Sequence, residues 1–93
     1  MSSESKRRDI SDVVLPKELL EIKEILAENV HECWSQQRLQ EGWRYGKARD
    51  EKIKVTPCLV PYSELPEEEK DYDRQTSLET IKLLLKLGFK ISR

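Results

Sequence analysis

The chain of 93 residues contains little of what an enzyme active site usually requires. It has one histidine, two cysteines and three glycines, and it lacks a glycine-rich phosphate-loop motif. Cys33 and Cys58 follow no metal-ligand spacing, so we interpret both as small core residues. His31, next to Glu32 on an expected helix, is interpreted as a surface or second-layer side chain rather than a general base. We therefore expect no catalytic residue, no metal, no cofactor and no enzymatic activity.

Long apolar runs and an excess of one charge are also lacking. The chain carries 17 basic and 18 acidic residues, which leaves no field that would hold a nucleic-acid backbone or an anionic membrane. It contains no run of 18 or more apolar residues, and its first ten residues carry no apolar segment behind the charges. We expect a soluble, cytoplasmic protein with neither a nucleic-acid nor a membrane partner.

The first half of the chain predicts a tail followed by one long helix. Residues 1–12 are polar and are expected to form a flexible tail, which leaves residues 13–93 as a single domain. From about residue 17 to residue 40, apolar residues recur at steps of three and four, which predicts an amphipathic helix with one face in the core. That face comprises Leu19, Ile22, Leu26, Val30 and Cys33.

The second half predicts short strands and a second long helix. We expect extended segments at residues 53–56, 58–60 and 89–91, and a short helical turn where three glutamates follow Pro66. Thr76 and Glu79 have the spacing of a capping box, which predicts that the last helix begins there and ends before Gly88. The fold class expected is α+β, mainly α, with a long N-terminal helix packed on a C-terminal helix plus short antiparallel β-strands.

One cluster of aromatic and basic residues suggests recognition of a ligand. It consists of Trp34, Trp43, Arg44, Tyr45 and Arg49. Aromatic faces stack on planar rings, and guanidinium groups pair with phosphate oxygens. The alternative is that the tryptophans fill the core, which the position of Trp34 at the edge of the helical stripe favours. For Trp43, which follows a glycine at the helix end, both interpretations stay open.

Four segments carry a resemblance to a known family: LPKELLEIKEILAENVHECW, QEGWRYGKARD, KIKVTPCLVPYSELPEEEKDYDR and ETIKLLLKLGFKI. Together they span residues 15–91, and they resemble the RyR repeat, found as tandem pairs in ryanodine receptor calcium channels and singly in microbial proteins. Thr56 stands where that family commonly has a histidine. The resemblance implies a non-enzymatic, stand-alone RyR-repeat module of microbial type that senses a small molecule, possibly an adenine nucleotide or another planar molecule. It implies that the tryptophans of HECW and EGW contact the ligand. The alternative function is a protein–protein interaction or assembly domain with no small-molecule ligand.

The apolar arc of the last helix is wider than one core contact requires. A core-facing stripe covers ~100°, whereas here the arc includes Leu78, Ile81, Leu83, Leu84, Leu85 and Leu87. A two-fold homodimer, which would rebuild the pairing that the resemblance implies, would cover the excess. The alternative is that residues 13–15, residues 53–60 and Phe89 cover it within one monomer.

Overall fold

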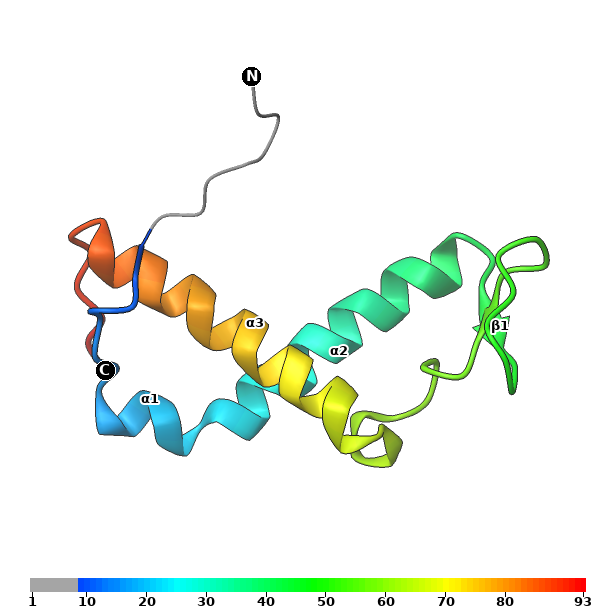
Figure 1. The fold of residues 1–93 in the computed structure, drawn as a ribbon, viewed down its shortest axis with the longest axis horizontal. Helices are drawn as coiled ribbons and strands as arrows, with labels where there is room; N and C mark the ends of the chain where they lie inside the picture. Colours follow the sequence, from blue (N-terminus) through cyan, green and yellow to red (C-terminus); the bar gives the residue numbers. More distant parts are fainter. Residues whose placement is uncertain (1–8) are drawn as a thin grey trace, which may run out of the picture.

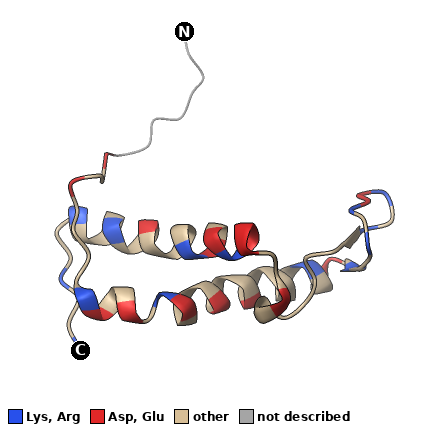
Figure 2. Cartoon of the chain, turned by 60° about the horizontal axis from the view of Figure 1, so that its bottom comes forward, with Lys and Arg blue, Asp and Glu red and all other residues tan. Residues whose placement is uncertain are grey.

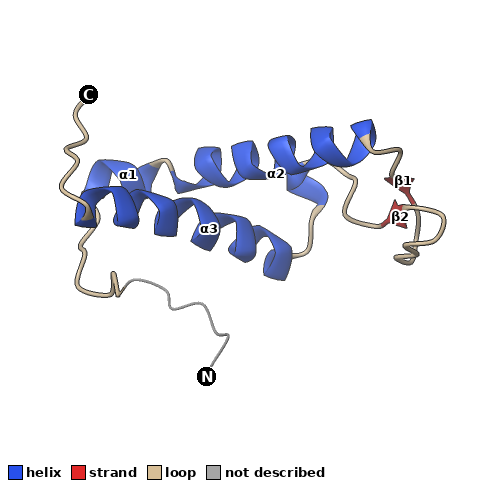
Figure 3. Ribbon diagram, turned by 90° about the horizontal axis from the view of Figure 1, so that it is seen from above, coloured by secondary structure: helices blue, strands red, loops and turns tan. Residues whose placement is uncertain are grey.

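The structure is a computed structural model that describes residues 9–93, with helices crossing at its centre. Two long helices, α2 (Lys23–Gln40) and α3 (Glu67–Lys86), cross within their N-terminal halves (Figure 1). The short helix α1 (Lys17–Glu21) and the segments leading to both termini lie at one end, and the strands lie at the other (Figures 1 and 3). Of the predicted tail 1–12, residues 1–8 lie outside the described residues, and the Ile10 side chain is buried.

The predicted first helix is present but interrupted. It runs from Lys17 to Gln40 with a break at Ile22, whose backbone (φ −104°, ψ 14°) is not helical. The Ile22 amide hydrogen-bonds the carbonyl of Leu19 (3.3 Å) instead of continuing the α-helical pattern. No glycine or proline stands in this stretch, so no local signal explains the break.

The last helix begins nine residues before the predicted capping box. Pro66 occupies its N-cap position, and the three glutamates that follow fill its first turn. The expected turn at 66–69 is thus the start of α3. Thr76 lies in the middle of the helix, where its hydroxyl donates to the Tyr72 carbonyl (2.8 Å), and the prediction that it caps the helix is wrong.

The strands are fewer than predicted, and they are parallel rather than antiparallel. The sheet consists of β1 (Arg44–Tyr45) and β2 (Val55–Thr56), with Arg44 opposite Val55. Residues 46–54 return the chain to the start of β1, helped by a positive φ of 55° at Lys54, so both strands run the same way. The only antiparallel pairing among the described residues is the single bridge between Asp50 and Val55. The other segments predicted as extended, 58–60 and 89–91, contain no strand.

Two glycines fix the path from α2 into the sheet. Gly42 has a φ of 94°, and it ends α2 in a Schellman turn in which the Trp43 amide donates to the Arg38 carbonyl (2.9 Å). Gly46 has no side chain where β1 meets β2: an added Cβ would lie 2.8 Å from the Cβ of Val55. These residues place Trp43 beside the C-terminal turn of α2.

The most buried apolar cluster is small and lies near the helix crossing. Ala27 of α2 is fully buried, and Tyr62 and Leu65 pack with it, flanked by Cys58 and Val60. Tyr62 belongs to the 3₁₀ helix η1 (Tyr62–Glu64) that leads into α3. The stripe predicted for the first helix is only half-buried, and Cys33 is exposed, because α2 presents the neighbouring face with Ala27 and His31 to the rest of the domain.

An ion-pair network also joins the two long helices. Arg74 of α3 holds both carboxylate oxygens of Glu24 on α2, at 2.5 and 2.9 Å, and Tyr62 donates its hydroxyl to the same carboxylate at 2.9 Å. These hydrogen bonds, with that of Arg74 first, lower the pKa of Glu24 to about 2. Burial and the Glu24 carboxylate raise the pKa of Tyr62 to about 12.

This network predicts a defined loss of stability in acid. The pKa of Glu24 is lower in the folded state than its ordinary value of 4.5. The ionised carboxylate therefore stabilises the folded state above pH 4.5, and this stabilisation is lost as the pH falls toward 2. Glu24→Gln should remove this contribution, so its melting temperature should fall less steeply with acidification than that of the unchanged protein. Thermal melts between these pH values test this, with Glu28→Gln, one turn further along α2, as the control. Equal acid sensitivity of both variants would contradict the assignment.

No helix among the described residues combines the length and apolarity needed to cross a membrane. The exposed surface of α2 and α3 carries charges of both signs (Figure 2).

Candidate functional site

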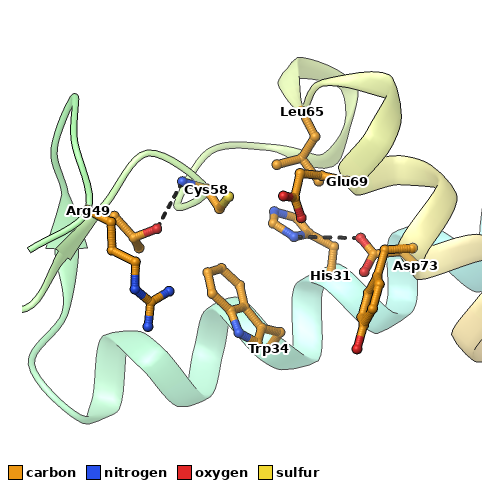
Figure 4. A pocket seen from close by; sticks show the side chains of 9 residues that line it. His31, Trp34, Arg49, Cys58, Leu65, Glu69 and Asp73 are labelled. Carbon is orange, nitrogen blue, oxygen red and sulfur yellow. Dashed lines mark hydrogen bonds and ion pairs between the residues drawn. The ribbon is translucent and has the colours of Figure 1, made fainter. Parts of the chain in front are cut away.

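A cavity of about 240 Å³ lies between α2, the first half of α3 and the loops on either side of β2. We call it the Trp34 pocket, and Figure 4 shows it from close by. Its lining residues are His31, Trp34, Arg49, Thr56, Cys58, Leu65, Glu69, Tyr72 and Asp73. They come from positions up to 42 residues apart, so the pocket exists only in the folded domain.

His31 is one of the buried residues that line the pocket. It is 4% exposed, so its interpretation as a surface residue is wrong. Its Nε2 lies 2.6 Å from the Val60 carbonyl. A carbonyl only accepts, so Nε2 carries the proton and donates it, and in the neutral ring Nδ1 is left as an acceptor. Nδ1 faces the Asp73 carboxylate at 4.0 Å.

Trp34 forms the aromatic wall of the pocket. It follows His31 by one helical turn, and the two rings are stacked with centroids 5.6 Å apart and planes at 22°. The guanidinium of Arg38, one turn further, lies 5.5 Å from the Trp34 ring centre. These contacts hold the half-buried indole in one orientation at the edge of the cavity.

Arg49 supplies the positive end of the pocket. Its guanidinium lies 5.1 Å from the Trp43 ring centre, and Arg38 lies 5.9 Å from the same ring. Trp43 is 9% exposed and is not among the lining residues. Trp43 therefore acts as a support that positions Arg49, whose side chain remains half exposed.

Glu69 and Asp73 form the opposite, acidic end. They lie one turn apart on α3, and Figure 4 shows Glu69 beside the His31 ring and Asp73 beyond it, away from Arg49. Burial, and to a lesser extent the Glu69 charge, raise the pKa of Asp73, although His31 opposes this. The pocket thus has a cationic end, an aromatic wall and an acidic end, where burial disfavours the charged form of Asp73.

Cys58 is not disposed to act as a nucleophile. Burial, followed by the Glu69 charge, raises the pKa of its thiol, which keeps the sulfur protonated. Its backbone amide donates to the Thr56 hydroxyl at 3.3 Å, and Thr56 itself is 2% exposed. Within the described residues, no three His, Cys, Asp or Glu side chains are grouped so that they could hold a metal ion.

Comparison with protein-family models gives one match for this chain. Residues 6–93, almost the whole chain, match the model of the RyR domain. The chain belongs to the RyR domain family. The resemblance found in the sequence is thereby confirmed.

In this RyR domain, the five residues predicted to bind a ligand do not share one site. Trp34 and Arg49 line the pocket, and Trp43 lies behind Arg49. Arg44 is exposed and donates to the Trp43 carbonyl at 2.7 Å, whereas Tyr45 is 56% exposed on β1, outside the Trp34 pocket. Trp34, for which the core interpretation was favoured, is only half-buried, whereas Trp43, for which both interpretations stayed open, is buried with the guanidinium groups of Arg38 and Arg49 near its ring.

Of the lining residues, only Trp34 and Arg49 were predicted from the sequence to bind a ligand. Trp34 follows His31 by three residues on α2, and Tyr72 and Asp73 follow Glu69 by three and four residues on α3, so helical spacing was a usable signal within each helix. Which of these faces meet depends on how α2 and α3 cross, and no local pattern determines that.

Proposed function

We propose that this RyR domain is a non-enzymatic module that binds a planar small molecule in the Trp34 pocket. The observation that carries the proposal is the order of groups along the cavity: a guanidinium, a fixed indole and two carboxylates. A planar ring with hydrogen-bond donors on its edge would place that edge toward Asp73 and lie against Trp34. An anionic substituent would reach Arg49.

An adenine nucleotide with a single phosphate fits this order of charges. The exocyclic amino group of adenine is a donor for Asp73 or Glu69, and the phosphate is a partner for Arg49. A triphosphate fits less well, because Arg49 is the only Lys or Arg among the lining residues while two carboxylates repel further negative charge. The absence of an activated nucleophile among the lining residues supports binding rather than catalysis, since the Cys58 thiol is held protonated and His31 Nε2 is engaged with Val60.

Calorimetric titration with adenosine, AMP and ATP tests the proposal. AMP should bind more tightly than adenosine, and ATP should bind no more tightly than AMP. Arg49→Ala should weaken AMP to the affinity of adenosine without affecting adenosine itself. Arg44→Ala is the matched control, because Arg44 is exposed and outside the pocket. Failure of all three compounds to bind at about millimolar concentration, ~4 kcal/mol of binding free energy, would favour the alternative of a protein-interaction module.

Asp73→Asn should separate binding from stability. The substitution removes a carboxylate whose pKa is raised by burial, so the variant should be at least as stable as the unchanged protein at neutral pH. The gain in stability should disappear in acid. Because the pKa of Asp73 is raised in the folded state, Asp73 is itself protonated and neutral at low pH. Ligand affinity should nevertheless fall, since the acceptor for the donor edge is weakened.

Thermal melts and titrations of the same preparations measure both effects, with the exposed Glu68→Gln on α3 as the control. A large loss of stability in Asp73→Asn at neutral pH would show instead that Asp73 is a structural partner of His31.

A further inference from the structure

The end of the molecule that carries α1 leaves many apolar side chains uncovered. The C-terminal end of α3, α1 and the two terminal segments meet there, on the side away from the strands (Figures 1 and 3). Lys86 of α3 pairs with Asp12 at 3.0 Å, and residues 91–93 and α1 border a groove of about 350 Å³. We call this end the terminal face, defined by Val14, Leu20, Leu84, Leu87, Phe89 and Ile91, which are between 40% and 88% exposed.

The uncovered apolar area is large for a domain of this size. Summed over these six residues, the exposure amounts to an area on the order of 500 Å², which is comparable to the ~300–600 Å² of the largest apolar patch on a typical monomer. A standard interface buries ~800 Å² on each partner, of which a little over half is apolar. The terminal face therefore supplies about the apolar area that one side of such an interface needs.

Residues 1–8 have few apolar side chains with which to cover this face. The sequence outside the described residues, 1–8, is MSSESKRR, and Met1 is its only apolar residue. Within the described residues, the radius of gyration is 16.2 Å, whereas a compact chain of this length would have ~12 Å. The fold is open, and its own elements leave the terminal face in solvent.

The charges on the terminal face are self-complementary. Residues 9–23 carry four acidic and two basic side chains, whereas residues 82–93 carry four basic side chains and no acidic one. Figure 2 shows the basic residues along the C-terminal part of α3. Under a two-fold axis, each surface meets its counterpart on the other copy, so the basic segment of one chain can face the acidic segment of its partner, and the reverse.

We propose that two copies of this chain pair through the terminal face as a two-fold homodimer. The occupant is a second copy rather than an unrelated protein, because one face supplies both the apolar area and the two opposite charges that an isologous interface requires. The pairing is independent of the Trp34 pocket and rests on none of its residues.

Light scattering coupled to size exclusion tests the pairing at protomer concentrations from roughly 1 to 200 µM. The expected mass is twice the 11.0 kDa of the chain at the upper concentration. Leu87→Glu and Phe89→Glu should each weaken association at least about tenfold, because a charge would be buried in the contact. Both side chains are more than half exposed in the monomer, at 51% and 62%, so neither variant should unfold it, and circular dichroism checks this.

Ile53→Glu is the matched control. Ile53 is 68% exposed in the loop before β2, at the opposite end of the molecule, and its substitution should leave the dimer intact. A monomer mass at the highest concentration would overturn the proposal. A dimer that resists both Leu87→Glu and Phe89→Glu would also overturn it, because the contact would then lie elsewhere.

Discussion

Tyr62→Ala is expected to unfold the domain or bring it close to unfolding. Tyr62 is 7% exposed and packs against Ala27 and Leu65 in the most buried cluster, and its hydroxyl donates to Glu24. Removing a buried aromatic ring of this kind typically costs ~3–5 kcal/mol. A domain of this length has a total stability of only ~5–14 kcal/mol. Its melting temperature should therefore fall by roughly 15 °C or more.

The matched control for this prediction is Tyr72→Ala. Tyr72 is also a tyrosine near the pocket, but it is 71% exposed, so its removal should change the melting temperature by only a few degrees. Tyr62→Phe should fall between the two, because it keeps the ring and loses only the hydrogen bond to Glu24. Denaturation of all three variants, followed by circular dichroism, measures the series. Similar losses for Tyr62→Ala and Tyr72→Ala would contradict the position of the core.

The second large effect concerns ligand binding, where Trp34→Ala should remove most of the affinity. Stacking on an aromatic side chain contributes ~1–3 kcal/mol per base, which corresponds to a loss of roughly 5- to 150-fold. Trp34 is the residue that the structure places on the cavity wall, held there by His31 and Arg38. Its half-buried side chain makes the expected loss of stability smaller than that of Tyr62→Ala.

Tyr45→Ala is the control for the Trp34 prediction. Tyr45 belongs to the same aromatic and basic cluster in the sequence, but it lies on β1 outside the Trp34 pocket. Titrations of AMP into both variants should show full affinity for Tyr45→Ala and weak affinity for Trp34→Ala, whereas Trp34→Phe, which keeps a smaller ring, should recover part of the loss. If Tyr45→Ala lost as much affinity as Trp34→Ala, the ligand would bind at the strands rather than in the pocket.

The helices show why part of the fold could be predicted and part could not. The outer bounds of the first helix, 17 and 40, and the end of the last helix before Gly88 follow from periodicity and from glycines that accept a positive φ. The break at Ile22 has no such signal. The capping box at Thr76 is a valid local pattern, but the start at Pro66 and the packing of α3 against α2 override it.

The residues of the candidate site also include some that could be predicted from the sequence and some that could not. Trp34 and Arg49 could be proposed from composition, because aromatic and guanidinium groups recognise planar and anionic ligands wherever they lie. His31, Glu69 and Asp73 could not be joined to them, since the distances between these residues depend on the crossing of α2 over α3. Trp34 lines the cavity, whereas Trp43 packs against Arg49 outside it. This difference depends on the turn at Gly42, which sets the position of Trp43.

By itself, the sequence determined the family, the mainly helical content, the places where α2 and α3 end, and the residue types available for recognition. These features depend on interactions between near neighbours in the chain: backbone dihedral preferences, helical periodicity and the charges of the first turn. The tertiary structure alone decided the parallel direction of β1 and β2, the break at Ile22, the burial of His31 and the membership of the Trp34 pocket. The physical reason is that each of these features depends on contacts between segments far apart in the chain. The crossing of α2 and α3 and the path of the loop between β1 and β2 together set the relative positions of those segments.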